Sequence, residues 1–380
     1  MTRRRLVLVG GGHVHLEVLR AAARHPFDAE LVLVSPERRQ LYSGRMPAQL
    51  RGRVSAHDLS IDLPALCRAA RARFVEARAS RVEADSRGGV VATTSGAFAG
   101  DVISLDVGAS VAGFDTPGVA EHAFSTRPAD RWLALVARVD TCVAEGNGKA
   151  VSCCVVGAGV GGIEIAFAVH ARITAARCVA AVTLVDSTHR VLGAWDDGAV
   201  ERVLRLLRER GIGVHLDACV ARVTATAVEL RDGQALSADV TVWTTGPAPH
   251  EWVTRSPLAL NAAGWLRVDA TLRAVDGRAV WGAGDCIALE HAPWMPRSGV
   301  YAVRAAPVLA RNLRVAADGS GQPAEFHPQR RALALLDTAD GRALAHWGQF
   351  TTGGRWGWWL KHFIDGQYVH RYHRLYDHRE

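Results

Sequence analysis

The chain has 380 residues, of which 49% are apolar and 22% charged, a composition typical of a globular protein with two or three domains. Its net charge of +7 comes almost entirely from arginine, and no basic run interleaved with aromatic residues precedes residue 346, so we expect no nucleic-acid partner. No apolar stretch is long enough to span a bilayer, the first apolar run is too short for a signal peptide, and seven cysteines without a C-x-x-C pair suggest no disulfide framework. We therefore expect a cytoplasmic protein.

The first informative unit is a strand, a glycine turn and a helix near the N-terminus. An apolar strand over 6–9 is followed by Gly10, Gly11 and Gly12, a helical pattern and a second strand over 31–34. Such a turn lets the backbone approach a pyrophosphate, whose charge the helix N-terminus stabilises. The unit lacks a third glycine, because His15 stands there, and Ser35 follows the second strand in place of a carboxylate. Taken alone, it fits a dinucleotide site and an ordinary turn equally well.

A second unit of the same kind lies in mid-chain and is complete. A strand over 153–156 leads into Gly157, Gly159 and Gly162, a helix follows, and the next strand ends at Asp186. A carboxylate at this position accepts hydrogen bonds from ribose hydroxyls and repels a 2′-phosphate, which favours NADH, although Arg190 leaves NADPH open. The alternative is a set of glycines that only turn a tight corner.

Two short strands mark the passages between domains. One runs over 102–106 and ends near Gly108, and the other runs over 240–245 and ends at Gly246. The sequence therefore predicts an α/β protein with two Rossmann-like domains, the NAD domain inserted in the FAD domain. We expect a discontinuous FAD-binding domain over 1–112 and 244–325, an NAD(P)H-binding domain over 113–243, and a small C-terminal segment over 326–380.

A third signal links these parts. The strand that begins at Ala279 ends in Gly282-Ala-Gly284-Asp285, where the carboxylate could bond the ribityl chain of a flavin. The alternative is a helix cap or turn residue. In this order the three elements form a specific signature. The chain resembles the pyridine nucleotide-disulfide oxidoreductase superfamily, within it the type II NADH dehydrogenase-like group, and especially the flavoprotein fused ahead of selenide, water dikinase. The resemblance rests on residues 9–19, 42–47, 61–67, 157–164, 282–286 and 298–304.

The resemblance implies roles for particular residues. Residues 42–47 would lie near the isoalloxazine, where disulfide-reducing relatives carry cysteines that this segment lacks, and residues 299–304 would begin a helix whose dipole faces the flavin. Glu164 matches a glutamate near nicotinamide and flavin, although an ordinary first-turn carboxylate is equally consistent. The FAD residues would be Gly10, Gly11, Gly12, His13, Ser35, Tyr42, Arg45, Gly108, Gly284, Asp285, Gly299 and Val300, and the NAD residues Gly157, Gly159, Gly162, Glu164, Asp186 and Gly246.

The cysteines suggest no disulfide chemistry. Cys153 and Cys154 fall on a buried strand, and Cys67 and Cys178 on apolar helical faces, so core packing is expected for all four. Only Cys286 is expected near the flavin. Disulfide reduction and sulfide:quinone chemistry are therefore disfavoured. No metal site is expected either, and His13 and His15 are expected to make local hydrogen bonds.

The C-terminal segment is rich in aromatic residues interleaved with arginine and histidine over 347–376. This mixture suits peripheral contact with a membrane at its inner face. The alternatives are packing onto the flavin domain or onto a partner in a homodimer, and the run 356–365 gives no clean helical stripe.

The favoured function is a ping-pong NADH dehydrogenase, with hydride passing from NADH to FAD and onward to a small acceptor such as a quinone. Two alternatives stay open. One is an oxidoreductase of selenium or sulfur compounds, which a reactive Cys286 would support, and the other is a flavin-binding partner protein without turnover.

Overall fold

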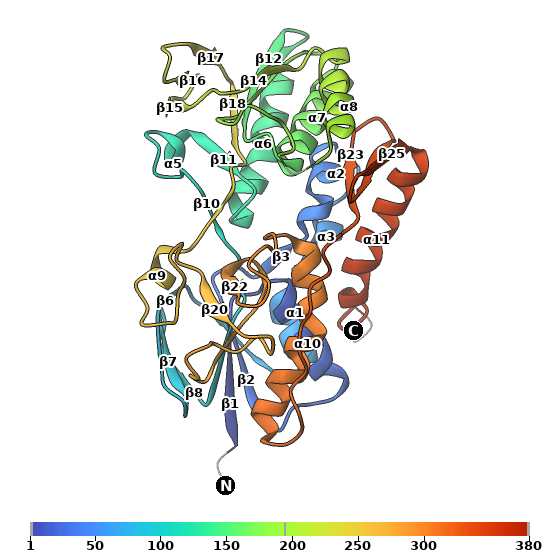
Figure 1. The fold of residues 1–380 in the computed structure, drawn as a ribbon. Coiled ribbons are helices and arrows are strands. Elements are labelled where there is room, and N and C mark those ends of the chain that lie inside the picture. The colour runs from blue at the N-terminus through green and yellow to red at the C-terminus, as the bar shows by residue number, and fades with distance from the viewer. Residues whose placement is uncertain (1–2, 194, 378–380) are drawn as a thin grey trace.

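The computed structural model describes residues 3–193 and 195–377 as two α/β domains and a C-terminal segment that lies along one side of both (Figure 1). The lower domain in Figure 1 contains the chain's N-terminus, and the upper domain contains the mid-chain residues. The predicted fold class is confirmed, because each domain is built on its own parallel sheet.

The lower sheet has the strand order β21-β9-β1-β2-β5, and all its strands are parallel. Residues 6–9 are at most 1% exposed, because helices cover one face and a three-stranded antiparallel sheet covers the other. Burial on both faces explains why these strands read as unbroken apolar runs. The elements are β1 (Arg4–Val9), β2 (Ala29–Ser35), β5 (Arg73–Glu76), β9 (Val102–Leu105), β21 (Val280–Gly282), the covering helices α1 (His13–Arg24), α4 (Leu63–Ala69) and α10 (Gly299–Asp318), and the covering strands β6 (Ala79–Ala84), β7 (Gly89–Thr93) and β8 (Gly96–Gly100).

The upper sheet has the strand order β11-β18-β12-β13-β14 and is also parallel. Its first and last strands in the sequence come from 123–125 and 240–243, as an inserted domain requires. The elements are β11 (Ala123–Ser125), β12 (Ala150–Val156), β13 (Val179–Val185), β14 (Gly213–His215), β18 (Val240–Trp243), the helices α5 (Val119–His122), α6 (Ala129–Gly146), α7 (Val160–Ala175) and α8 (Asp197–Glu209), and a small sheet of β15 (Val220–Val223), β16 (Ala227–Leu230) and β17 (Ala235–Ser237).

The two passages between the domains pair with each other. Strand β10 (Ser110–Val111) and strand β19 (Pro247–Ala248) form an antiparallel pair, and the backbone N–H of Ala112 donates to the carbonyl of Gly246 over 2.8 Å. The chain thus leaves and re-enters the lower domain at one place. The exact domain boundaries given above stay predictions.

Short elements at the edges complete the lower part. Among them, α2 packs against α7 of the upper domain rather than against its own sheet, and residues Leu41, Met46 and Leu50 belong to the core of the upper domain. These elements are β3 (Arg39–Leu41), η1 (Ser43–Arg45), α2 (Met46–Leu50), α3 (Ala56–Leu59), β4 (Ser60–Asp62), α9 (Glu251–Thr254), β20 (Leu266–Val268), η2 (Gly284–Cys286) and β22 (Ile287–Leu289).

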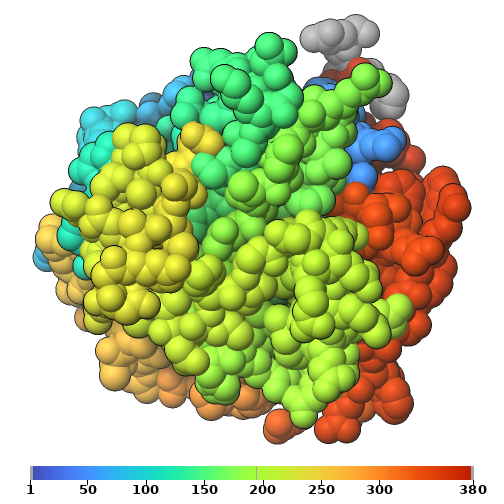
Figure 2. Space-filling model, turned by 90° about the horizontal axis from the view of Figure 1, so that it is seen from above, coloured from blue at the N-terminus to red at the C-terminus, as the bar shows by residue number. Residues whose placement is uncertain are grey.

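The C-terminal segment consists of β23 (Ala334–Asp337), β24 (Ala343–Trp347), β25 (Phe350–Gly354) and the long helix α11 (Arg355–His373). Figure 2 looks down on the upper domain and shows this segment, in red, lying against it. Thr351 donates to Asp196 over 2.9 Å, and Arg210 pairs with Asp340 at 3.0 Å. At its other end α11 packs on α3 and β4 of the lower part. One segment therefore joins both domains.

The third glycine of the upper turn is required by space. A methyl group at Gly162 would lie 1.8 Å from the carbonyl oxygen of Gly157, because α7 begins directly against the end of β12. The neighbouring Gly161 has no atom within 4 Å of the same position, although both residues lie in the first turn of α7. The two positions therefore form a matched pair for substitution.

We expect Gly162→Ala to destabilise the upper domain by about 1–3 kcal/mol, because the helix must move away from the strand. Gly161→Ala should be neutral or stabilising by up to about 1 kcal/mol, since alanine is the better helix former. Urea unfolding without nicotinamide nucleotide measures both. Equal stability of the two variants would contradict the close approach.

Candidate functional site

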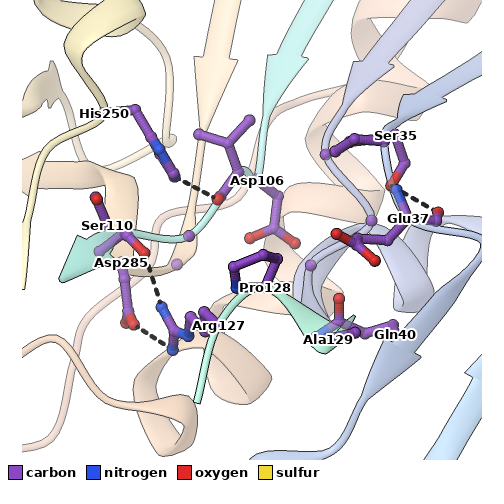
Figure 3. A pocket seen from close by; sticks show the side chains of 18 of the residues that line it. Ser35, Glu37, Gln40, Asp106, Ser110, Arg127, Pro128, Ala129, His250 and Asp285 are labelled. Atoms are coloured by element: carbon purple, nitrogen blue, oxygen red, sulfur yellow. Dashed lines mark hydrogen bonds and ion pairs between the residues drawn. The ribbon is translucent and has the colours of Figure 1, made fainter. Parts of the chain in front are cut away.

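A cavity of about 400 Å³ lies where β1 and β9 end and α10 begins, and its opposite wall is residues 126–129 and Arg131 of the upper domain. Figure 3 shows its side chains converging from both sides. Of the residues predicted to bind FAD, most line this cavity, namely Gly10, Gly11, Gly12, His13, Ser35, Gly108, Gly284, Asp285 and Gly299. Tyr42, Arg45 and Val300 are not among its lining, and Arg45 instead donates to the carbonyl of Asp58 over 2.7 Å. Their part in binding FAD stays a prediction.

His15 occupies the position where the lower turn lacks its third glycine. Its Nδ1 is 2.7 Å from the carbonyl oxygen of Gly10 and its Nε2 is 2.8 Å from the hydroxyl of Ser104. Burial lowers the pKa of His15 to about 4, so the ring is neutral at physiological pH. The predicted local hydrogen bonding is therefore present, and the imidazole fixes α1 to the end of β1, where the upper turn uses direct backbone contact.

His13 lines the cavity and lies beside a stacked pair of tyrosine rings. Its ring meets Tyr42 and Tyr368 edge-on, with centroids 5.6 and 5.5 Å away, and these tyrosines stack on each other at 4.4 Å. Burial, with help from Arg127, lowers the pKa of His13 to about 4. Its buried Nδ1 has no hydrogen-bond partner in the described chain, so the local hydrogen bonding predicted for His13 is not found at this atom; such an unpaired buried group is rare in folded proteins. A ligand with polar atoms, such as a flavin nucleotide, fits this wall.

Asp285 faces the cavity beside a partner that the motifs did not indicate. Arg127, which comes from the upper domain, places Nη2 3.2 Å from the Asp285 carboxylate (Figure 3). A guanidinium at this place suits an anionic cofactor. Arg127 could not be found from spacing alone, because it precedes a helix of the other domain.

The hydroxyl of Ser35 is hydrogen-bonded to the backbone of Glu37. Its Oγ donates to the carbonyl of Glu37 over 2.9 Å and accepts from the Glu37 N–H at 3.2 Å (Figure 3). Glu37 also lines the cavity, and burial raises its pKa above the usual value. A carboxylate therefore lines the cavity two residues after the end of β2, and a search just beyond the strand end would have found it.

The upper turn holds its predicted carboxylate at the glycines. Asp186 accepts hydrogen bonds from the N–H of Ala158 at 2.6 Å and from the N–H and hydroxyl of Thr188 at 2.8 and 2.7 Å. Arg190 does not face it, but pairs with Asp197 at 2.5 Å. Gly157, Gly159 and Gly162 lie between β12 and the first turn of α7, while Gly246 lies on the passage between domains.

Glu164 belongs to a buried polar cluster that includes α11. It is 7% exposed and accepts from the N–H of Asp337 at 2.8 Å. Lys361 places its Nζ 3.6 Å from Glu164 and 3.3 Å from Asp365, and the hydroxyl of Tyr42 donates to Asp365 over 3.0 Å. The cluster thus runs from the upper domain to the tyrosines beside His13. The sequence did not indicate Lys361 or Asp365, because both lie in a segment read as interfacial.

In this cluster the ammonium group of Lys361 lies beside two carboxylates, those of Glu164 and Asp365. Burial raises the pKa of Glu164 to about 7, although Lys361 lowers it in part. Burial opposes the charge on Lys361, but Glu164 and Asp365 outweigh it and hold the lysine's pKa above its usual value. Because two carboxylates share one ammonium, Glu164 is the group able to carry a proton near neutral pH.

The run 356–365 has no clean apolar stripe, as the sequence indicated, and it is nevertheless helical. This run is part of a regular helix, and the stripe it buries is polar and small, so no apolar period could reveal it. The buried residues are Gly357, Lys361 and Asp365 within this run, and Tyr368, Val369, Tyr372 and His373 in the remainder of α11. Tyr368 and Tyr372 therefore pack onto the lower domain. Packing onto the flavin domain was one of the alternatives given for the aromatic residues of this segment.

The cysteines lie mostly as expected. Cys153 and Cys154 are buried on β12 and Cys67 is buried on α4. Cys178 is also buried, but it lies in the turn between α7 and β13, so its predicted helical position was wrong. Cys286 is 3% exposed, and burial raises the pKa of its thiol to about 12.

One group among the described residues has the composition of a metal site. Ligand atoms of His57, His373 and Asp377 lie within 4.8 Å of one another at the far end of α11. His373 also places Nε2 2.9 Å from the carbonyl oxygen of Ser60. This group is separate from the cavity lining, and the sequence motifs did not indicate it.

We expect Glu164→Gln to change how stability depends on pH. The folded-state pKa of Glu164, about 7, lies above its usual 4.5, so its stabilising contribution is complete below pH 4.5 and is lost as pH rises through 7. The variant should lack a fall in unfolding free energy of up to about 3 kcal/mol between about pH 4.5 and 7.

Denaturant unfolding at several pH values measures this slope. Glu145→Gln, at an exposed position on α6, is the matched control and should keep the wild-type slope. An unchanged slope in Glu164→Gln would show that Glu164 is ionised throughout.

Comparisons with known proteins agree with this geometry. The sequence profile of the pyridine nucleotide-disulphide oxidoreductase family matches residues 4–306. An NADH dehydrogenase-like protein of Mycobacterium tuberculosis is 29% identical over 296 residues, which cover 75% of this chain and 73% of the relative. The resemblance to the flavoprotein ahead of selenide, water dikinase stays a prediction.

Solved structures share the fold at low identity. NDH2 of Plasmodium falciparum in complex with NADH superposes with a TM-score of 0.80 at 13% identity, covering 99% of this chain and 98% of the other. The sulfide:quinone oxidoreductase of Aquifex aeolicus has a TM-score of 0.80 at 18% identity, covering 98% and 92%. FAD and a nicotinamide nucleotide, the predicted cofactors, are those of such flavoproteins. The chain belongs to the pyridine nucleotide-disulphide oxidoreductase family and is an oxidoreductase of the NADH dehydrogenase-like kind.

Proposed function

We propose that this protein is an NADH dehydrogenase that passes electrons from NADH through FAD to a small diffusible acceptor, for which a quinone is the leading choice. The observation that carries the proposal is a cavity between the two domains, lined by the flavin-type glycine turn and Asp285 and by no cysteine of the described chain. When bound there, FAD would supply the two-electron chemistry. Without a cysteine pair at the cavity, the electrons have no disulfide to pass through.

The upper turn supports NADH as the donor. Asp186 presents a carboxylate at the glycines, where a 2′-phosphate would meet like charge. The guanidinium of Arg190, which could have offset that charge, is paired with Asp197. Gly157, Gly159 and Gly162 would hold the pyrophosphate, as their motif implies.

The buried cluster supports an acceptor that takes up protons with electrons, as a quinone does. Glu164 can hold a proton near neutral pH, and Lys361, Asp365 and the Tyr42 hydroxyl continue the polar path toward His13. The name of the Aquifex aeolicus neighbour also contains a quinone. Burial of Cys286 argues against the alternative in which this thiol acts on selenium or sulfur compounds.

We expect NADH to bleach the flavin band near about 450 nm under anaerobic conditions, and NADPH to do so with an apparent affinity lower by about tenfold or more. A soluble quinone should restore the band, whereas an oxidised disulfide should not. Rapid-mixing absorbance spectroscopy measures each step. No bleaching with either nucleotide would overturn the proposal, and recovery with the disulfide alone would replace the acceptor.

We also propose that the outer side of the C-terminal segment contacts a lipid surface. Six of the twelve exposed large apolar side chains of the described chain fall between residues 347 and 364, and we call them the aromatic face: Trp347, Phe350, Trp356, Trp359, Phe363 and Ile364. Trp359, Phe363 and Phe350 are 65%, 64% and 72% exposed. Tryptophan at a lipid–water boundary beside exposed Arg355 fits peripheral binding. Among the described helices, none is long and apolar enough to cross a membrane.

The triple variant Trp356→Ser, Trp359→Ser, Phe363→Ser should lower binding to anionic liposomes by more than about tenfold, because three large side chains no longer enter the interface. Deleting α11 is unsuitable, since its inner side supplies Lys361. The control is Leu133→Ser with Val179→Ser, two exposed apolar positions elsewhere. Co-sedimentation measures binding, and equal sedimentation of all three proteins would exclude the aromatic face.

A further inference from the structure

The carboxylate of Asp106 lies at the N-terminus of α1, directly under the lower glycine turn. Asp106 follows β9, is 3% exposed, and accepts hydrogen bonds at Oδ2 from the N–H groups of Val14 at 2.7 Å and His15 at 2.9 Å. A methyl group added at Gly12 would lie 2.5 Å from either carboxylate oxygen, and one added at Gly284 would lie 2.7 Å from Oδ1. The carboxylate is thus wedged between two predicted FAD-binding glycines.

Figure 3 shows how this carboxylate faces the cavity. It stands between the Asp285–Arg127 pair on one side and Glu37 on the other. It reaches the cavity from the strand next to β1, at the position where helix dipole and backbone N–H groups would attract a pyrophosphate. The protein has therefore placed its own anion where the cofactor's anion is expected.

The groups around Asp106 do little to neutralise it. No ion pair to Asp106 occurs within 4 Å in the described chain, and Arg127 is engaged by Asp285. On α1, His13 and His15 are neutral for the reasons given above, and burial lowers the pKa of His250, whose Nε2 is 3.0 Å from the carbonyl of Val107. From η2, the Asp285 carboxylate and the buried Cys286 thiol add no positive charge.

Burial raises the pKa of Asp106 to about 7, and the two backbone N–H groups only partly offset this. Asp285 raises it further, and Arg127 lowers it. The carboxyl can therefore change its protonation state within the physiological range of pH.

We propose that Asp106 and the pyrophosphate of FAD share the N-terminus of α1, so that FAD binds to the form of the protein in which Asp106 is protonated. Two anions at one helix terminus repel each other in a site removed from water. A neutral carboxyl keeps Oδ2 on the two N–H groups and can donate its O–H from Oδ1 to a phosphate oxygen. FAD binding then takes up one proton, and Asp106 sets how tightly FAD is held at a given pH. The inference rests on the proposed FAD site at Gly10–Gly12.

The test is to measure the Kd of FAD for the flavin-free protein at pH values between 6 and 9. Flavin fluorescence reports the binding. We expect the wild-type Kd to rise by about tenfold per pH unit above pH 7, as uptake of one proton requires. Asp106→Asn should bind FAD without this slope and more tightly than wild type at pH 9. Asp285→Asn is the matched control, and it should weaken binding at every pH while keeping the slope.

Calorimetry on the wild-type protein gives a readout that does not depend on any variant folding. Titrations with FAD at pH 8 in two buffers of different ionisation enthalpy should show uptake of about one proton. Zero uptake, or the same slope in wild type and Asp106→Asn, would overturn the role of Asp106 and leave the FAD site intact. Absence of FAD binding at every pH would overturn the site and the inference together.

Discussion

In both glycine turns the first turn of a helix lies against the residue that follows the preceding strand. In the upper domain this contact is made by backbone alone, because only a hydrogen fits between Gly162 and the carbonyl of Gly157. In the lower domain the same approach is bridged by the ring of His15, which reaches the carbonyl of Gly10. The two turns thus reach the same geometry in different ways. The upper turn has no side chain at Gly162, and the lower turn has the buried side chain of His15. The direction of each helix dipole, and with it the place where a negative charge would be stabilised, follows from that contact.

The second constraint is the buried charge on α11. A lysine withdrawn from water is stable only beside carboxylates, and Lys361 finds Glu164 on the upper domain and Asp365 on its own helix. The inner side of the helix is therefore held by this ion cluster at one end and by the apolar packing of Tyr368, Val369 and Tyr372 at the other, while its outer side keeps aromatic residues exposed. These two sides carry separate tasks. The inner one completes the polar path beside the flavin cavity, and the outer one is free to meet a surface.

The sequence could predict the parts of the structure that are determined by residues close together in the chain. The two strand–turn–helix units and the glycines of their turns follow from short motifs whose geometry is fixed by neighbouring residues, whereas the start of α10 at Gly299 followed from the family resemblance. What escaped prediction comes from pairing across the chain. Arg127 meets Asp285 from another domain, Glu37 supplies a carboxylate just past the expected position, and α11 buries a polar stripe that no apolar period reveals. Asp106 was within reach, since it follows a buried strand as Asp186 does.

The packing of α2 onto α7 has a consequence for motion. The chain passes between the two domains at β10 and β19. Two further segments contact both sides of the boundary: α2 extends from the lower part into the core of the upper domain, and the C-terminal segment packs against both domains. Both segments therefore cross the boundary between the domains. If the domains moved apart at the passages, apolar residues of one of these segments would be exposed to water. The relative position of the two glycine turns is thereby held by the packing of α2 and of the C-terminal segment. A rearrangement of the two domains would require one of these segments to detach first.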